Sequence, residues 1–372
     1  MTSTALPRGP IPLEPLPAGP LVSVLLPNYN YARYLPGAVE SVMAQTYERW
    51  ELIVCDDGST DNSCDTIAPH LERDARIRLL RQSNGGQASA LNSAYAASQG
   101  QILCILDADD AFRSNKLERV VKRLAERQDA GLLVHAMTLV DAAGAPLHRI
   151  PILSAFEEGW IADRVLQRGG RWRYMPSSGL VFRRELGAIG FPIPQHAFVE
   201  GAEGFLFTLF PLFTETTFIS EELSVYRIHG MNMGGRVGVD AASARKGARL
   251  MTQVVEGVNE RLAEMALAGT LQVKDNLHIS LELLIAHLLE GEPRPRLFRR
   301  YITAVRAIMA DDLYGTGQKL MLPLLFGWAT LLPRRWRRTW LNLAISSGTL
   351  KRAVVWMVTG LRRSVRFSPD TL

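Results

Sequence analysis

Short apolar runs alternate with helix-compatible stretches through the first 110 residues, and this rhythm restricts the fold more than any other feature of the chain. The apolar runs are residues 21–26, 50–55, 77–80 and 102–106, and the stretches between them include 33–45 and 88–98. Two parallel strands need a crossover of about a dozen residues or more, usually a helix. The pattern therefore predicts stacked βαβ units, an α/β fold in which helices cover both faces of a mainly parallel sheet.

A polar cluster follows each of these four runs. The clusters are residues 27–30, 56–59, 84–87 and 107–110. Ligands of open parallel sheets bind beyond the carboxyl ends of the strands, because loops and helix N-termini converge there. The sequence therefore predicts a ligand site at this edge of the sheet.

Carboxylates dominate two of the clusters. Asp107 and Asp109 are two residues apart after a buried strand, and Asp56 and Asp57 end a neighbouring strand. Mg²⁺ and Mn²⁺ prefer oxygen ligands and are commonly held by one or two carboxylates together with substrate phosphates. Asp-rich turns also cap helices and accept bonds from loop amides. Two acidic clusters at adjacent strand ends favour the metal site over that second interpretation.

The cluster at residues 84–87 reads Asn-Gly-Gly-Gln and resembles a turn whose backbone amides hold a phosphate. A single Gly-Gly pair is weak evidence for such a turn. The chain has neither GxGxxG nor GxxxxGK[ST], so neither a dinucleotide-binding fingerprint nor a P-loop supports it.

The remaining chain divides into a mixed and a helical region, and 372 residues suffice for two or three structural units. We expect a strand at 132–140, a helix near 160–168, an apolar run at 180–182, a buried helix within 204–213 and a closing strand at 224–229. From about residue 241 helical periodicity dominates, with breaks at 269, 291–295 and 315–317.

The N-terminus and the cysteines indicate where the protein resides. The first 20 residues contain six prolines and no apolar run of secretory-signal length, which predicts a disordered leader over 1–20. Three cysteines without a CxxC pair indicate reduced thiols. Both features predict a cytoplasmic location.

Four segments together resemble a family 2 glycosyltransferase with the GT-A fold. They read VSVLLPNYN at 22–30, SVMAQTY at 41–47, DDGSTD at 56–61 and LDADD at 106–110. The resemblance extends from residue 21 to about residue 232, and its motifs agree in order, spacing and strand-end placement. It implies a GT-A three-layer α/β/α catalytic domain over 21–235, followed by a helical region over 236–372.

The same resemblance implies a nucleotide-diphosphate-sugar donor and residues that bind it. Asp107 lies near the ribose, whereas Asp109 binds Mn²⁺ or Mg²⁺ with His229, and Arg227 lies near the pyrophosphate. The other positions that match the donor nucleotide site are Pro27, Tyr29, Asp56, Asp57, Asn84 and Gln87.

On the acceptor side the resemblance is less complete. Ser177, Ser178 and Gly179 match an acceptor-side loop, and Glu203 stands where the family most often has an Asp as catalytic base. Glu200 is the alternative base. A single base suffices for a displacement that inverts the anomeric carbon. The chain lacks the QxxRW motif and flanking membrane helices of polymer synthases, which predicts transfer of one sugar to a glycan, lipid-linked or small-molecule acceptor, as in cell-envelope polysaccharides.

Two other functions are compatible with parts of this pattern. A catalytically inactive nucleotide-sugar-binding or scaffold protein would explain the Glu at position 203. A sugar-1-phosphate nucleotidyltransferase would need a Gly- and Lys-rich loop after the first strand, and residues 27–34 contain no such loop.

The net charge of +5 conceals a strongly basic C-terminus. Residues 313–372 hold ten Lys or Arg, one Asp and four of the seven tryptophans. The apolar stretch 321–332 contains Pro323 and is shorter than the roughly 20 residues that span a bilayer. Residues 321–366 are typical of a helix in the interface of an anionic membrane, here its inner face, and equally of a helical cap packed on the catalytic domain. No recognised module accompanies the basic residues, so we expect no nucleic-acid binding.

Overall fold

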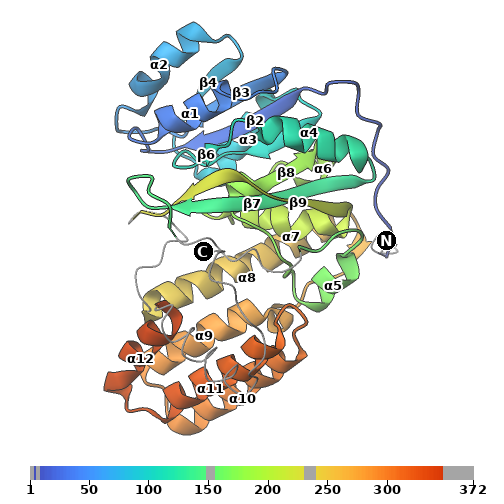
Figure 1. The fold of residues 1–372 in the computed structure, drawn as a ribbon. Helices are drawn as coiled ribbons and strands as arrows, with labels where there is room; N and C mark the ends of the chain where they lie inside the picture. Colours follow the sequence, from blue (N-terminus) through green and yellow to red (C-terminus); the bar gives the residue numbers. More distant parts are fainter. Residues whose placement is uncertain (1–3, 6–8, 148–155, 230–239, 347–372) are drawn as a thin grey trace, which may run out of the picture. The chain divides into compact units, whose positions relative to one another are not determined.

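The computed structural model describes residues 4–5, 9–147, 156–229 and 240–346. The chain forms two compact units (Figure 1): Met1–Gly235 with Leu250–Val273, and Arg236–Arg249 with Lys274–Leu372. Helix α8 (Ala241–Glu264) contributes residues to both units. The first unit is therefore not the continuous segment 21–235 that the sequence predicts.

Eight of the ten described strands of the first unit form one sheet, in the order β4-β3-β2-β5-β8-β7-β9-β6. Its first half is the parallel arrangement that the apolar runs predict: β2 (Val22–Asn28) lies between β3 (Trp50–Asp56) and β5 (Ile102–Ile105), and β4 (Ile77–Arg81) pairs with β3. Nearly every residue of β2 and β3 is buried, as expected for strands that are covered on both faces.

The second half of the sheet is mixed. Strand β8 (Leu180–Arg183) is antiparallel to both β5 and β7 (Ala130–Val140), β7 and β9 (Glu215–Arg227) are parallel, and the short β6 (Ala111–Phe112) is antiparallel to β9. The predicted closing strand at 224–229 is the last part of the longer β9. Its earlier part, rich in Thr and Glu, carries no apolar run that the sequence could have revealed.

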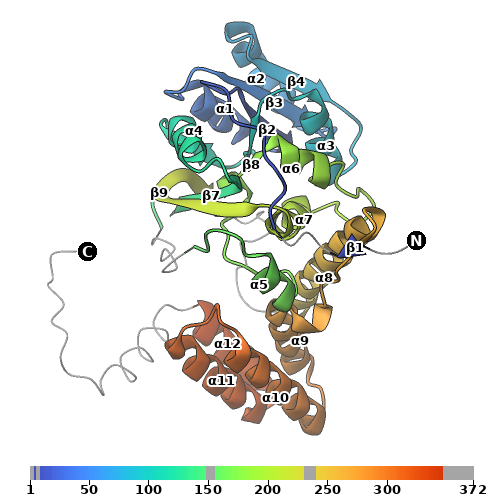
Figure 2. The same cartoon turned by 90° about the vertical axis from the view of Figure 1, so that its right-hand side faces the viewer.

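Helices cover both faces of this sheet and confirm the predicted α/β sandwich. Figure 2 shows α1 (Leu35–Met43) and α4 (Lys116–Glu126) on one face, and α3 (Gln87–Ala97) and α6 (Arg184–Gly190) on the other. Alternate residues of β2, such as Val24 and Leu26, pack into one core with α1 and α4, because successive side chains of a strand point to opposite faces. The remaining helices are α2 (Ser63–Arg73), α5 (Ala162–Gln167) and α7 (Ala202–Leu209).

Residues 9–20 lie against the first unit, which differs from the disordered leader that the sequence predicts. Ile11 N donates to the Phe213 carbonyl oxygen over 2.8 Å, the buried Arg183 guanidinium donates to the Glu14 carbonyl oxygen, and Leu16 packs on the core. Proline restricts φ and carries no N–H, so a Pro-rich segment loses little conformational freedom on ordering and has few donors to satisfy. Strand β1 (Thr4–Ala5) pairs with β10 (Leu267–Ala268).

Helices make up the described part of the second unit. They are the start of α8, then α9 (Leu277–Glu290), α10 (Arg294–Ala310), α11 (Thr316–Leu331) and α12 (Arg334–Ser346). The predicted breaks at 291–295 and 315–317 coincide with the ends of these helices. Residues from α9 to α12, such as Leu288, Ala304, Phe326 and Leu341, share one core, so the described part of the tail packs within its own unit.

The described helices do not include one that is both long enough and apolar enough to cross a membrane. Residues 347–372, with Trp356 and the last basic residues, lie outside the described part of the chain.

Deleting residues 1–18 should destabilise the first unit by about 1–3 kcal/mol, because the deletion removes the Leu16 contact and the carbonyl oxygen to which the buried Arg183 donates. We expect a lower Tm in a thermal-unfolding measurement. Deletion of residues 1–8 alone is the matched control, since it leaves those contacts in place. Equal Tm values for the wild type and both deletion variants would show that residues 9–18 add no stability.

Candidate active site

A cavity of about 570 Å³ opens in the first unit where β2, β3 and β5 end. It lies at the edge of the sheet where the polar clusters were expected to converge. Nine of the residues predicted for the site line it: Pro27, Tyr29, Asp57, Asn84, Gln87, Asp107, Asp109, Ser177 and Glu203. The structure thus brings together residues that are up to 176 positions apart in the sequence.

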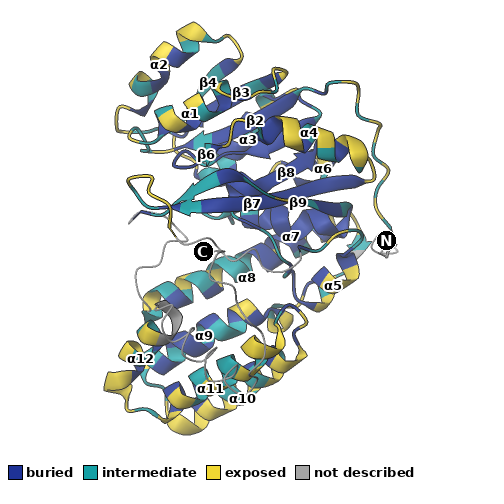
Figure 3. Ribbon diagram, viewed as in Figure 1, coloured by how far each residue is buried: buried dark blue, intermediate teal, exposed yellow. Residues whose placement is uncertain are grey.

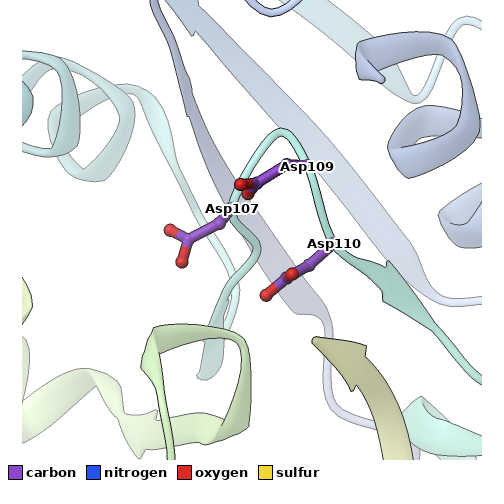
Figure 4. A group of neighbouring side chains, drawn as sticks. All are labelled: Asp107, Asp109 and Asp110. Atoms are coloured by element: carbon purple, nitrogen blue, oxygen red, sulfur yellow. The ribbon is translucent and has the colours of Figure 1, made fainter. Parts of the chain in front are cut away.

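Three carboxylates gather on the turn after β5. Oxygens of Asp107, Asp109 and Asp110 lie within 4.8 Å of one another, and Figure 4 shows all three side chains on this one tight turn. Asp107 and Asp109 are among the residues predicted for the site, whereas Asp110, in the same LDADD segment, is not. Its position next to Asp109 was the available signal.

Burial disfavours the charged forms of this cluster. It raises the pKa of Asp107 well above its usual range, and the neighbouring carboxylates Asp110, Glu203 and Asp109 raise it further. Burial and Asp109 likewise raise the pKa of Asp110, whose Oδ2 is buried without a hydrogen-bond partner among the described residues. A hard divalent cation fits this set of oxygen atoms, since it would offset the repulsion and occupy the open oxygen.

Residues from the short 3-10 turn before β8 (Ser177–Gly179) and from β9 hold the acidic turn in place. Asp107 N donates to Ser178 Oγ over 3.0 Å, and Ser177 Oγ donates to Asp107 Oδ2. Arg227 N donates to Asp110 Oδ1 over 2.9 Å, and Arg227 Nε donates to the Asp109 carbonyl oxygen over 3.0 Å. The antiparallel insertion of β8 beside β5 therefore supports the turn directly.

His229 and Arg227 contact the turn from outside the cavity. His229 Nε2 lies 2.8 Å from Asp109 Oδ2, and its ring stacks on Tyr34 at 5.0 Å between centroids. The Arg227 guanidinium lies 5.3 Å from the centre of the same Tyr34 ring. Neither residue is among those that line the cavity, so both support Asp109 in this structure.

Glu203 lies in the first turn of α7, and its placement depends on Gln87. Gln87 Oε1 accepts hydrogen bonds from Gly201 N at 2.8 Å and Ala202 N at 3.1 Å, and thereby caps α7. Burial raises the pKa of Glu203, while a hydrogen bond from the Gln87 side chain lowers it. Glu203 Oε2 is buried without a partner among the described residues, and Glu200 lines the same cavity.

Asp57 binds the turn at residues 84–87, which we call the glycine turn. The prediction that this turn binds a phosphate is wrong. Gly85 N and Gly86 N donate to the two carboxylate oxygens of Asp57 over 3.0 and 2.7 Å, and Gln87 N donates to the Val199 carbonyl oxygen. These amides are therefore already bonded within the protein and are not available to a phosphate. At Gly86, φ is +84° and a Cβ would lie 2.8 Å from Val199 Cα, which explains the glycine.

The predicted residues Asp56, Ser178 and Gly179 lie behind the cavity wall. Asp56 accepts from Asn28 Nδ2 at 2.8 Å and from Ser59 N at 3.0 Å. The Ser178 carbonyl oxygen accepts from Lys116 Nζ at 2.9 Å, and a Cβ on Gly179 would lie 2.9 Å from Met175 Cβ. These residues fix the wall and do not line it.

The fold also brings residues to the site that were not predicted from the sequence. Tyr31, Tyr226 and Val199 line the cavity. Lys116 is fully buried beneath it, and burial lowers its pKa to about 7. Tyr31 directly follows the VSVLLPNYN segment and Tyr226 precedes the predicted Arg227, so both stand next to a sequence signal. Val199 and Lys116 carry no such signal, because only the fold brings their segments to the site.

Replacing Asp110 with Asn should raise the Tm of the metal-free protein above pH 7, because the amide removes a buried charge that the site disfavours. A carboxyl group whose pKa is raised by folding stabilises the fold at low pH, and this contribution is lost as the pH rises from about 4. The Tm of the wild type in EDTA should therefore fall with rising pH more steeply than that of Asp110→Asn.

Asp163→Asn, at an exposed position in the same unit, is the control for this measurement and should follow the wild type. Parallel pH profiles for wild type and Asp110→Asn would contradict the electrostatic account of the turn.

Known proteins resemble both the sequence and the fold. The model of the family described as "Glycosyl transferase family 2" matches residues 23–186. An uncharacterized glycosyltransferase of Nostoc sp. is 31% identical over 261 residues, which cover 69% of this chain and 80% of that protein. A putative teichuronic acid biosynthesis glycosyltransferase of Bacillus subtilis, TuaG, is 36% identical over 131 residues, or 35% of this chain and 52% of that protein.

Among solved structures, TarS of Staphylococcus aureus, residues 1–349 in complex with UDP-GlcNAc, matches with a TM-score of 0.52 at 15% identity. The match covers 87% of this chain and 91% of that one. At this identity the likeness establishes the fold.

Proposed function

The chain belongs to glycosyltransferase family 2, and we propose that it transfers one sugar from a nucleotide-diphosphate-sugar to an acceptor hydroxyl with inversion at the anomeric carbon. One observation carries the proposal: a single cavity is lined both by the acidic turn and by Glu203. A donor diphosphate and an attacking hydroxyl could therefore be held side by side.

The nucleotide would occupy the part of the cavity near the ends of β2 and β3. Pro27 and Tyr29 line it, and the Tyr29 side chain is 45% exposed, which leaves its ring free to pack against a base. Asp57 and Asn84 line the same part, and Asp107 would lie near the ribose. The UDP-GlcNAc named for the TarS structure supports this class of donor.

The diphosphate would lie at the acidic turn with Mn²⁺ or Mg²⁺. Asp109 is the proposed ligand, supported by Asp107 and Asp110, whose oxygens lie close enough to share one ion. When bound, a divalent cation neutralises charge that develops on a departing diphosphate. His229 and Arg227 would fix Asp109 through its carboxylate and its carbonyl oxygen.

Glu203 is the proposed general base. The acceptor hydroxyl would lose its proton to Glu203 Oε2 while its oxygen forms a bond to the anomeric carbon. The bond from that carbon to the diphosphate oxygen breaks, and its electron pair leaves with the nucleoside diphosphate. The raised pKa of Glu203 favours transfer of the acceptor proton to its carboxylate. Glu203 Oε2 has no hydrogen-bond partner among the described residues and can accept a proton. This favours a catalytic function over that of an inactive binding protein.

The acceptor would enter beside Ser177, with Ser178 and Gly179 as the supporting wall. We propose a glycan or lipid-linked acceptor of the cell envelope, modified on the cytoplasmic side of the membrane. The printed name of TuaG, which refers to teichuronic acid biosynthesis, supports an envelope glycan. The catalytic part would comprise residues 9–235 with 250–273.

Asp109→Ala should lower kcat by about 100-fold or more and weaken the rise in Tm that a nucleotide-diphosphate-sugar and Mn²⁺ produce together. The measurement is a thermal-shift screen of such donors with and without Mn²⁺, followed by a transfer assay with the donor that binds. Full activity of this variant in saturating Mn²⁺ would contradict the metal site.

Glu203→Gln should lower kcat by about 100- to 10,000-fold while the donor affinity stays near that of the wild type, because the amide keeps the size of the side chain but cannot accept the proton. Glu200→Gln is the matched control and should retain most activity. The reverse result would assign the base to Glu200. Donor binding without turnover in the wild type would favour the inactive binding protein.

A further inference from the structure

Exposed apolar side chains are concentrated in the second unit. Of the twelve large hydrophobic residues that are exposed in the described part of the chain, eight lie on α10, α11 and α12: Phe298, Met309, Leu320, Leu324, Trp328, Leu331, Trp336 and Leu343. Figure 3 shows exposed positions along all three helices. We call the surface formed by these eight residues the outer face.

Helix α11 is apolar on two opposite sides. Phe326 and Ala329 point into the core of the unit. Leu320, Leu324, Trp328 and Leu331 follow one another at helical spacing, so they form one stripe, and each is at least half exposed. A surface helix normally turns charged or polar residues toward water. The stripe of α11 has no polar residues, although a helix side that faces only water would be expected to carry them.

A second stripe on α10 runs beside the first. Phe298 and Met309 are 56% and 51% exposed, and Ile302 and Val305 between them are half-buried. The helices are antiparallel and tied at both ends: Lys319 Nζ donates to the Met309 carbonyl oxygen over 2.9 Å, and Arg294 Nη2 donates to the Leu331 carbonyl oxygen over 3.3 Å. The stripes therefore lie next to each other.

Helix α12 extends the outer face on the other side of α11. Trp340 Nε1 donates to the Leu325 carbonyl oxygen of α11 over 3.0 Å. Trp336, four residues earlier, is 52% exposed. Helix α9 contacts α10 and α12 and shares their core, and Figure 2 shows α10, α11 and α12 side by side. The three helices thus form a layer with a packed inner side and a largely apolar outer side.

The charge of this layer is strongly positive. Residues 294–346 hold ten Lys or Arg and only two acidic residues, Asp311 and Asp312. Arg299 and Arg306 each follow a residue of the α10 stripe by one position, which places them at its edge. Neither forms an ion pair with any residue that the structure describes. Arginines beside exposed Trp and Leu are the composition of helices that lie in a membrane interface.

We propose that the outer face of α10, α11 and α12 docks on an anionic lipid bilayer, with the three helices lying on its surface and Trp328 and Trp336 at the level of the headgroups. This inference rests on the proposed function in one respect, because an envelope or lipid-linked acceptor is found at a membrane. The charge selects this partner. A second copy of the chain would place arginines against arginines in a symmetric dimer, whereas anionic headgroups attract each nearby basic residue.

The test is co-sedimentation of the full chain with vesicles of phosphatidylcholine that contain about 30 mol% phosphatidylglycerol. We expect the wild type to bind these vesicles, to bind pure phosphatidylcholine at least about tenfold more weakly, and to be released by high salt. The double variant Leu324→Ser/Trp328→Ser should bind at least about tenfold more weakly because it loses apolar contact with the lipid.

A second double variant, Arg299→Gln/Arg306→Gln, keeps the apolar stripe intact. It should bind the anionic vesicles at least about tenfold more weakly than the wild type does, whereas its binding to pure phosphatidylcholine should be unchanged. Leu147→Ser is the matched control, since Leu147 is an exposed apolar residue of the first unit, and it should bind as the wild type does. All variants should keep the wild-type Tm.

Absence of vesicle binding by the wild type, or equal binding by wild type and both double variants, would overturn the proposal. A wild-type dimer in light scattering that Leu324→Ser/Trp328→Ser converts to monomer would assign the face to a second copy instead. Transfer to a soluble acceptor should be unchanged in the double variants. Double variants that lose vesicle binding but keep full transfer activity would therefore support the outer face as the docking surface. The transfer activity of Asp109→Ala tests the active site separately.

Discussion

The carboxylates on the turn after β5 are the constraint around which the catalytic unit is arranged. Oxygens of Asp107, Asp109 and Asp110 within 4.8 Å of one another repel each other where burial removes the screening of water. Such a turn persists only if other parts of the chain hold it. Ser178 does so from the turn before β8, and Arg227 from the end of β9. These contacts keep the three carboxylates together at the expense of local stability.

The mixed half of the sheet follows from that requirement. Strand β8 is antiparallel to β5 and begins just after Ser177 and Ser178, so both hydroxyl groups lie beside the turn. Strand β9 ends at Arg227, whose backbone and side chain bond to Asp110 and Asp109. In a wholly parallel sheet β8 would start at the opposite edge, away from the turn, whereas β9 runs in the same direction as β5 and reaches the turn with its last residue. The change of strand direction therefore helps to form the site.

The two units of the chain differ in the charge and polarity of their functional surfaces. The first unit concentrates buried acids around a cavity, and the second concentrates basic and apolar side chains on the outer face of α10, α11 and α12. Their opposite charges nearly cancel in the net charge of +5. The overall charge thus says little about either surface, because electrostatic attraction acts over about 10 Å and depends on where the charges lie.

The sequence alone determined the parallel strands β2 to β5, the polar clusters at their ends, the family and nine of the cavity-lining residues, because hydrophobic periodicity and strand-end motifs are local properties. Only the tertiary structure decided that Asp57 holds the glycine turn, that Gln87 caps the helix of Glu203, that residues 9–20 are ordered, and that Arg227 and His229 contact Asp109. Each of these roles is a contact between segments far apart in the chain, such as the 114 positions from Gln87 to Gly201. A local pattern specifies which groups can form such bonds, but the packing of the sheet determines which partners they meet.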